Sequence, residues 1–350
     1  MIRFALIGCG TIAAKHIQAL ARIEDAAVAC VCDRDATAAR ALGDQLEVPW
    51  FTDPAAMAEA QDFDVFSVLT PSGDHAATVL GLARFGRHFI IEKPMALRVE
   101  DADAMIAACD GAGAKIFVVK QNRCNPPVAA LKAALTAGRM GKPVLATVRV
   151  RWSRPQAYYD ARPWRGTWAQ DGGVLTNQAA HHIDTLLWLM GDVESVSAMT
   201  ATRLAAIEAE DTGVAILRFS SGALGVIEAT TATRPKDLEG SVSVLCEKGS
   251  VEIGGFFMNE LKTWQMTDQI PEDAEIFTTH ARVPNIPAWN HEQYLRGVIS
   301  SLRSGIAGMV DGLQGRKSLE VIMAIYEAAE TGRTVDLRFR PQRCRLGIAQ

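Results

Sequence analysis

Two basic side chains, Lys93 and His181, stand in contexts that favour proton-transfer chemistry. Lys93 belongs to Glu92-Lys93-Pro94, which directly follows an apolar segment of strand length. A lysine ammonium that is partly desolvated beside another positive charge loses pKa, and can then exchange a proton with a substrate hydroxyl. On these residues alone, a surface lysine at the end of a strand is an equally good interpretation.

His181 lies in a second group of polar residues, with Asn177 before it and Asp184 after it. The spacing i, i+4, i+7 predicts that one face of a helix presents the three side chains together, with His182 pointing elsewhere. A metal site built from His181, His182 and Asp184 is the weaker alternative, because adjacent histidines on a helix diverge and no further ligand cluster appears. We therefore predict no metal.

A glycine-rich turn opens the chain. Gly8-Cys9-Gly10-Thr11-Ile12-Ala13 has the form G-x-G-x-x-A and stands between a strand-like segment and a helix-like one. In this setting Gly8 permits a tight turn and Gly10 lets a pyrophosphate approach the backbone, while Thr11 and Ile12 open the helix whose N-terminus favours anions. The pattern predicts a dinucleotide site, and a turn that binds nothing is the alternative.

The residue at position 33 bears on which dinucleotide binds. Asp33 ends the second strand-like segment, about where a carboxylate would meet the ribose hydroxyls. That carboxylate would repel a 2′-phosphate, so the sequence favours NAD over NADP. Arg34, which follows it, keeps NADP open as an alternative.

The elements that position these residues alternate through the first 120 residues. Apolar runs of strand length are separated by Ala-rich amphipathic stretches, which is typical of a parallel sheet with helical crossovers. We expect strands at 3–8, 27–32, 65–69, 88–91 and 116–120, and helices at 12–22, 37–46, 74–85 and 101–109. The pattern predicts a doubly wound Rossmann domain of the α/β class over residues 1–122.

From residue 123 onward the pattern changes to longer alternating segments joined by hairpin-type turns. Expected strands are 144–152, 193–202, 212–219, 223–231 and 240–246, followed by helices at 287–303 and 312–331. We therefore predict an α+β domain over 123–350, with a mostly antiparallel, open-faced sheet. An apolar sheet face of this kind predicts a homodimer or homotetramer, and the Arg-rich tail at 338–350 is expected to be solvated or bound at an interface.

Composition narrows the class of protein. The chain is 49% hydrophobic and 22% charged, with a formal net charge of −4, so it offers no global positive field for a nucleic acid partner. No apolar run reaches membrane-spanning length and no leader-like segment follows Met1, which favours a cytoplasmic protein without a membrane partner. The seven cysteines include no CxxC pair and are expected to be reduced.

Three motifs together resemble the Gfo/Idh/MocA family of sugar and inositol oxidoreductases. They are Glu92-Lys93-Pro94, the polar residue followed four positions later by His181, and Thr70-Pro71-Ser72 with His75. The resemblance implies that Lys93 and His181 bracket the reacting carbon, and that the remaining cofactor contacts come from Thr70, Pro71, His75, Glu92, Lys93 and Gln121. The family usually has aspartate where this chain has Asn177, so Asn177 is expected to orient a substrate hydroxyl.

The stretch 149–168 is rich in arginine and aromatic residues, holding five arginines, three tryptophans and two tyrosines. Arginine forks suit phosphate or carboxylate oxygens, and flat aromatic rings suit a base or a sugar. We expect substrate contacts from Lys93, Asn177 and His181 together with Arg154, Tyr159, Trp164 and Arg165. The alternative is that the tryptophans are core residues and the arginines are solvated.

Together with 120–123, 176–184 and 234–240, this stretch resembles the branch of the family that oxidises UDP-N-acetylglucosaminuronate at C3, in bacterial surface polysaccharide synthesis. The resemblance implies a UDP-sugar substrate, Lys93 as the base, His181 as the group that positions or polarises the oxygen, and possible recycling of NAD by a 2-oxo acid. Three alternatives stay open: a family dehydrogenase of a free sugar or inositol, a redox-neutral glycosidase that uses bound NAD, and a non-catalytic NAD-binding sensor.

Overall fold

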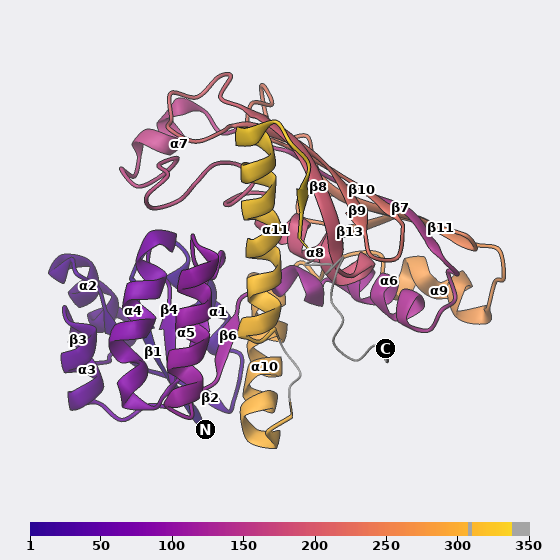
Figure 1. The fold of residues 1–350 in the computed structure, drawn as a ribbon. Helices are drawn as coiled ribbons and strands as arrows, with labels where there is room; N and C mark the ends of the chain where they lie inside the picture. Colours follow the sequence, from indigo (N-terminus) through magenta and orange to yellow (C-terminus); the bar gives the residue numbers. More distant parts are fainter. Residues whose placement is uncertain (307–309, 338–350) are drawn as a thin grey trace, which may run out of the picture.

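The computed structural model describes residues 1–306 and 310–337. These residues form two lobes, a Rossmann lobe built from the N-terminal part of the chain and a second lobe built around a large sheet, with the long helix α11 (Gly312–Thr331) beside both (Figure 1). The expectation about the tail at 338–350 lies outside the described residues. The six cysteines within them are all free thiols.

The Rossmann lobe is centred on a six-stranded sheet in the order β3-β2-β1-β4-β5-β6. All of its strand pairs are parallel, which confirms the doubly wound prediction. Its strands are β1 (Ile2–Ile7), β2 (Ala26–Cys32), β3 (Trp50–Phe51), β4 (Val65–Val68), β5 (His88–Ile91) and β6 (Ile116–Val118).

Helices cover both faces of this sheet. One hydrophobic cluster joins the sheet to α1 (Ala13–Leu20), α2 (Ala36–Leu46) and α10 (Trp289–Ser304). The cluster on the other face holds α3 (Pro54–Ala60), α4 (His75–Leu82), α5 (Val99–Gly111) and the N-terminal part of α11. Two helices from the end of the chain thus contribute to the core of the first lobe.

Strand β3 and helix α3 were not expected from the sequence. β3 has only two residues, too few to show alternation. The start of α3 did carry a signal, because Asp53 accepts hydrogen bonds from the backbone N–H groups of Ala55 and Ala56 and is followed by Pro54 at the first helical position.

The second lobe holds an eight-stranded sheet in the order β13-β12-β11-β7-β10-β9-β8-β14. Among the strands of the described residues, β7 and β10 form the only parallel pair of this sheet, so the prediction of a mostly antiparallel sheet is confirmed. The strands β12, β13 and β14 and helix α9 (Pro271–Thr279) were not predicted. The strands are β7 (Pro143–Arg151), β8 (Val193–Ala201), β9 (Thr212–Phe219), β10 (Leu224–Thr230), β11 (Glu239–Cys246), β12 (Gly249–Gly254), β13 (Glu260–Met266) and β14 (Val335–Asp336).

One face of this sheet is covered and the other is open. Helices α6 (Pro126–Thr136), α8 (Ala180–Met190) and α11 share a hydrophobic cluster with the covered face. On β9, buried residues alternate with exposed ones, so that Ala215 and Leu217 face the helices while Val214 and Ile216 face outward. Within the described ranges, no helix is long and apolar enough to cross a bilayer.

Candidate active site

The predicted chemical residues gather where the strands of the Rossmann sheet end. Gly8 follows β1, Asp33 follows β2, Thr70 follows β4, Lys93 follows β5, and Gln121 opens the short 3₁₀ helix η3 (Gln121–Cys124) after β6. Ligands of open α/β sheets bind at this carboxyl edge. Asn177 and His181 of the second lobe face the same edge, as their contacts with Lys93 and Gln121 show.

The glycine-rich turn has the shape of a phosphate cradle. Gly8 has φ +105, and a Cβ atom built on it would lie 2.7 Å from the carbonyl oxygen of Leu69, so no other residue fits. A Cβ on Gly10 would meet nothing within 4 Å, which leaves open space in front of Thr11 and Ile12 at the start of α1. The backbone here fits a dinucleotide pyrophosphate.

The Asp33 carboxylate is fixed by backbone donors. Its Oδ2 accepts a hydrogen bond from the Cys9 N–H at 2.8 Å, and its Oδ1 accepts one from the Asp35 N–H at 2.9 Å. These contacts hold a negative charge beside the glycine-rich turn, where it can accept hydrogen bonds from the hydroxyls of a ribose. The Arg34 side chain is 82% exposed and lies 3.9 Å from Asp74.

His75 connects two loops at the rim of this site. Its Nδ1 lies 2.9 Å from the carbonyl oxygen of Pro94 and its Nε2 lies 3.0 Å from that of Thr70. Burial lowers the pKa of His75, and a neutral imidazole carries one N–H, so one of the two contacts is a hydrogen bond. Both ring nitrogens thus face protein groups, while Thr70 and Pro71 remain partly exposed.

Glu92 is buried beneath the site beside a histidine that the sequence reasoning missed. Its Oε1 lies 2.9 Å from Nε2 of His16 on α1, and its Oε2 accepts the Lys93 N–H at 3.2 Å. Burial raises the pKa of Glu92, but the hydrogen bond and charge of His16, with smaller contributions from His291 and Lys93, outweigh it and lower the pKa to about 2. We therefore treat Glu92 as a buried anion.

His291 completes this buried cluster. Its ring packs edge-on against that of His16, with centroids 5.7 Å apart. Potential ligand atoms of His16, Glu92 and His291 lie within 4.8 Å of one another, although the direct His16–Glu92 contact already uses two of them. A single histidine on the buried face of α1 gave no sequence signal for this cluster.

The Lys93 ammonium is held by Asn177 across the two lobes. Nζ donates to the backbone oxygen of Asn177 at 2.9 Å and to its Oδ1 at 3.0 Å, which leaves its third N–H for a ligand. Burial lowers the pKa of Lys93, although the Glu92 and Asp171 carboxylates oppose the shift. Lys93 is thus oriented, partly desolvated and easier to deprotonate than a surface lysine.

His181 lies next to this lysine. Its Nε2 is 3.2 Å from the side-chain nitrogen of Gln121, and its Nδ1 is buried without a partner among the described residues. Burial, followed by the charges of Lys93 and Lys120, lowers the pKa of His181 well below its ordinary value. The ring is therefore neutral near pH 7 and can polarise an oxygen without a full charge.

The prediction that Asn177, His181 and Asp184 share one helical face is wrong for Asn177. Helix α8 begins at Ala180, and Asn177 lies in the turn before it, where its N–H donates to the backbone oxygen of Gly173. Asp184 is on the helix, but it accepts two hydrogen bonds from Arg123, each of 2.8 Å, and fixes α8 to η3. His182 points elsewhere as expected, and its ring packs against that of Trp152.

The Asp171 carboxylate is a further site residue that the sequence reasoning did not select. Its Oδ1 accepts a hydrogen bond of 2.6 Å from Nδ2 of Asn177, and its Oδ2 accepts one of 2.9 Å from the Gly166 N–H. The only signal in the sequence was an acid directly before two glycines. The structure therefore places a carboxylate behind the amide that holds Lys93.

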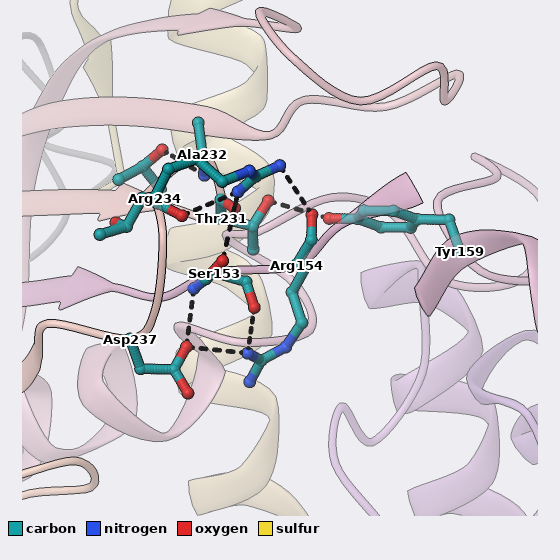
Figure 2. Close-up of polar contacts among 9 residues, drawn as sticks. Ser153, Arg154, Tyr159, Thr231, Ala232, Arg234 and Asp237 are labelled. Carbon is teal, nitrogen blue, oxygen red and sulfur yellow. Dashed lines mark hydrogen bonds and ion pairs between the residues drawn. The ribbon is translucent and has the colours of Figure 1, made fainter. Parts of the chain in front are cut away.

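Several residues of the Arg-aromatic stretch are engaged within the second lobe. Arg154 pairs with Asp237 at 3.0 Å, and the Tyr159 hydroxyl lies 2.9 Å from that of Thr231; both contacts are drawn in Figure 2. Tyr159 is buried, so it contributes to packing more than to an open surface. Nearby, Arg234 donates to the backbone oxygens of Arg154, Thr231 and Thr233, which stabilises the loop (Figure 2).

Arg165 is closer to the chemical residues. Its guanidinium lies 4.0 Å from the centre of the Tyr158 ring and 5.5 Å from that of Trp164, and its buried Nε has no partner among the described residues. Burial raises the pKa of Asp171, while the Gly166 N–H, the charge of Lys93 and, to a smaller degree, that of Arg165 stabilise its anion. The stretch therefore extends from the core of the second lobe toward the Lys93 site.

Known proteins resemble this chain over nearly its whole length. A dehydrogenase named WlbA from Bordetella pertussis, crystallised with NADH and UDP-GlcNAcA, is 42% identical, with coverage of 97% of this chain and 98% of that chain and a TM-score of 0.94. The Chromobacterium violaceum WlbA, in complex with the same two molecules, is 42% identical over 97% of each chain, with a TM-score of 0.91. D-apiose dehydrogenase from Paraburkholderia graminis is 29% identical, covering 95% of this chain and 89% of that protein.

Models of known protein families match residues in both lobes. Residues 2–120 match the oxidoreductase family with an NAD-binding Rossmann fold, and residues 128–252 match the GFO/IDH/MocA C-terminal domain. The cradle at Gly8 and Gly10 and the fixed Asp33 carboxylate fit the cofactor that these matches indicate, so NAD is the cofactor of this protein. With the 42% identity to solved dehydrogenases, these matches show that the chain belongs to the Gfo/Idh/MocA family of NAD-dependent oxidoreductases.

Proposed function

We propose that the protein oxidises the C3 hydroxyl of a UDP-N-acetylglucosaminuronate, giving a 3-keto sugar for bacterial surface polysaccharide synthesis. The observation that supports this most directly is the 42% identity, over 97% of the chain, to a dehydrogenase crystallised with NADH and UDP-GlcNAcA. The arrangement of Lys93, Asn177 and His181 at the carboxyl edge of the Rossmann sheet supplies the groups that such a reaction needs.

In this proposal Lys93 is the base. Its Nζ is held by two acceptor oxygens of Asn177, so after losing a proton its lone pair can face the substrate hydroxyl. The turn at Gly8 and Gly10 and the Asp33 carboxylate would hold NAD, which would supply the acceptor for the hydride from C3. Lys93 takes the hydroxyl proton, and the burial that lowers its pKa brings this transfer closer to neutral pH.

His181 has the supporting role. A neutral imidazole whose Nε2 accepts a hydrogen bond from the Gln121 amide carries its proton on Nδ1 and can donate one hydrogen bond to the reacting oxygen. Asn177 keeps the lysine pointed at the same position. We thus assign proton transfer to Lys93 and orientation of the substrate oxygen to His181.

We assign recognition of the charged parts of the substrate to the Arg-aromatic stretch. Arg165 has an unpartnered buried Nε and lies near the Asp171–Asn177 pair, so it is the best candidate for a uronate or phosphate oxygen. Trp164 beside it offers a flat ring. Arg154 would have to exchange its Asp237 partner for the ligand.

A second candidate is a dehydrogenase of a free sugar or inositol. It is favoured by the D-apiose dehydrogenase at 29% identity and by the myo-inositol 2-dehydrogenase of Thermotoga maritima at 26%, both of which align with at least 95% of this chain. Neither substrate carries a diphosphate. Under this alternative, replacement of Arg165 would have little effect on the KM.

The test is to follow NADH formation with UDP-N-acetylglucosaminuronate, UDP-N-acetylglucosamine, free aldoses and inositol at neutral to mildly alkaline pH. The proposal expects turnover, or a burst equal to the enzyme concentration, with the UDP-uronate and its loss in Lys93→Ala. A burst that becomes continuous when a 2-oxo acid is added would indicate recycling of NADH in place. Activity with an unactivated polyol alone would favour the second candidate and overturn the first.

A further inference from the structure

Asp171 is almost fully buried, with 2% of its surface exposed, although it is a carboxylate. Both of its oxygens are used: Oδ1 accepts from the Asn177 amide at 2.6 Å and Oδ2 from the Gly166 N–H at 2.9 Å. A buried carboxylate is costly unless it is paired or hydrogen-bonded. Its position directly behind the residue that holds Lys93 suggests a role beyond packing.

The first consequence concerns the orientation of Asn177. An amide group has one end that donates and one that accepts. Because Asp171 can only accept while ionised, it binds the Nδ2 end, and the Oδ1 end is left to face Lys93 Nζ at 3.0 Å. The carboxylate therefore prevents a flip of the amide, which would direct N–H groups at the ammonium.

The second consequence concerns charge. The charged and titratable groups around Lys93 are Glu92 and Asp171, which stabilise the ammonium, and Lys120 and His181, whose own protonation Lys93 disfavours. Around Asp171 lie Lys93, Arg165 and Glu210. Glu92 and Asp171 thus balance the positive charge of Lys93 from opposite lobes.

We propose that Asp171 is a positioning residue for Lys93, which fixes the amide of Asn177 and supplies, through it, a negative charge that sets the proton affinity of the lysine. The hydrogen bonds run from Lys93 to Asn177 and from Asn177 to Asp171. The carboxylate thus contacts the residue that touches the ammonium, and not the ammonium itself. The inference rests on the proposed function to the extent that Lys93 is taken as the base.

The loop that carries Asp171 is built to keep this geometry. Gly172 has φ +76, and a Cβ on it would lie 2.7 Å from Oγ1 of Thr176. Thr176 in turn lies 2.6 Å from the Tyr326 hydroxyl of α11. The backbone beside Asp171 therefore packs closely against Thr176, which contacts α11, so the carboxylate is not carried on a free loop.

A reciprocal exchange tests the proposal. Asp171→Asn removes the charge and leaves the Gly166 N–H facing an amide, so we expect kcat to fall about tenfold, and the rising limb of the kcat/KM pH profile to move about one unit to lower pH. The double variant Asp171→Asn with Asn177→Asp restores a carboxylate to this hydrogen-bonded series, now at position 177 directly beside Lys93. We expect it to move the limb back toward higher pH.

Asp211→Asn is the matched control. Asp211 is also a buried carboxylate, with 1% of its surface exposed, and it accepts the backbone N–H groups of Arg203, Leu204 and Ala205. Its replacement is expected to lower the Tm without moving the pH profile. If Asp171→Asn resembles this control, Asp171 is only structural and the proposal is overturned.

A second measurement separates this proposal from the substrate assignment. The titration of Lys93 can be followed in ¹³Cε-lysine-labelled protein by NMR, with Lys93→Met to assign the signal and no substrate present. The proposal expects the Lys93 transition to lie at lower pH in Asp171→Asn and to recover in the double variant. An unchanged transition refutes it even if the UDP-sugar is the substrate, whereas a shift without UDP-sugar activity rejects only the proposed function.

Discussion

Nε2 of His16 lies 2.9 Å from Oε1 of Glu92, 76 residues further along the chain. The two side chains are 0% and 8% exposed, so this pair fastens α1, which starts at the glycine-rich turn, to the strand end that carries Lys93. The cofactor cradle and the proposed base are thereby held by one buried contact.

Replacement of His16 by alanine is therefore expected to destabilise the protein by about 2–3 kcal/mol, since it leaves the Glu92 carboxylate buried without its main partner. Lys15→Ala, on the exposed side of the same helix, should change stability by less than about 0.5 kcal/mol. Urea unfolding of both variants measures the difference, and equal midpoints would contradict the importance of the pair.

The His16–Glu92 pair also predicts that the stability of the protein falls in acid. The pKa of Glu92 in the folded protein is about 2, against an ordinary value of 4.5. A carboxyl with a depressed folded pKa contributes stability that is present above the ordinary value and is lost as the pH falls from about 4.5 toward 2. The Tm of the wild type should thus decline more steeply in this window than that of Glu92→Gln.

Lys93→Arg tests the proton transfer itself. Arginine keeps the positive charge and can still donate to Asn177, but it stays protonated at any accessible pH. We expect kcat to fall by about 10³-fold, within the range for loss of a general base, while NAD binding, followed by quenching of tryptophan fluorescence, changes little. A variant that retained a tenth of the wild-type rate would show that Lys93 is not the base.

The buried carboxyl of Glu210 is expected to affect stability in the opposite direction with pH from that of Glu92. Burial raises its pKa to about 7, and its Oε2 has no partner among the described residues. An acid with a raised folded pKa favours folding when it is protonated, so its contribution is lost as the pH rises from about 4.5 to 7. Glu210→Gln should therefore be more stable than the wild type by about 1–3 kcal/mol at pH 8, and by much less at pH 5, with exposed Glu208→Gln as the control.

Two glycines should respond in opposite ways to alanine. At Gly8, a Cβ would lie 2.7 Å from Leu69 O in a φ +105 backbone, whereas at Gly81, in α4, it would meet nothing within 4 Å. Gly8→Ala is expected to weaken NAD binding by more than tenfold, and Gly81→Ala to stabilise the protein by about 0.5–1 kcal/mol. Calorimetric titration with NAD and thermal unfolding report the two effects.

The open face of the second sheet predicts self-association. Met199, Val214 and Ile216 are 81%, 46% and 58% exposed on adjacent strands, which forms an apolar patch of the kind that marks an interface. Ile216→Asp should therefore reduce the molar mass measured by light scattering, while Leu80→Asp, on α4 of the other lobe, should not. A monomeric wild type would contradict the expectation of a dimer or tetramer.

Local patterns in the sequence were enough to predict the parallel sheet, the glycine-rich turn and the positions of Lys93 and Asp33 at strand ends. These patterns did not identify His16 or Asp171, because the roles of these residues depend on contacts with residues from other elements of the fold. The spacing of Asn177 and His181 matched a helix, yet α8 begins only at Ala180 and Asn177 lies in the turn before it. The parallel β7–β10 pair also joins strands that lie far apart in sequence, which alternation alone does not reveal.

Tyr294, Leu295 and Val298 of α10 are fully buried against the Rossmann sheet, beside Val31 and Val65. During synthesis the strands of this sheet leave the ribosome more than 150 residues before their covering helix does. The N-terminal third of the chain must therefore wait with one face incompletely covered while most of the second sheet is translated. Folding of the Rossmann lobe is thus tied to the completion of the second lobe, and an isolated N-terminal fragment is expected to bind NAD poorly.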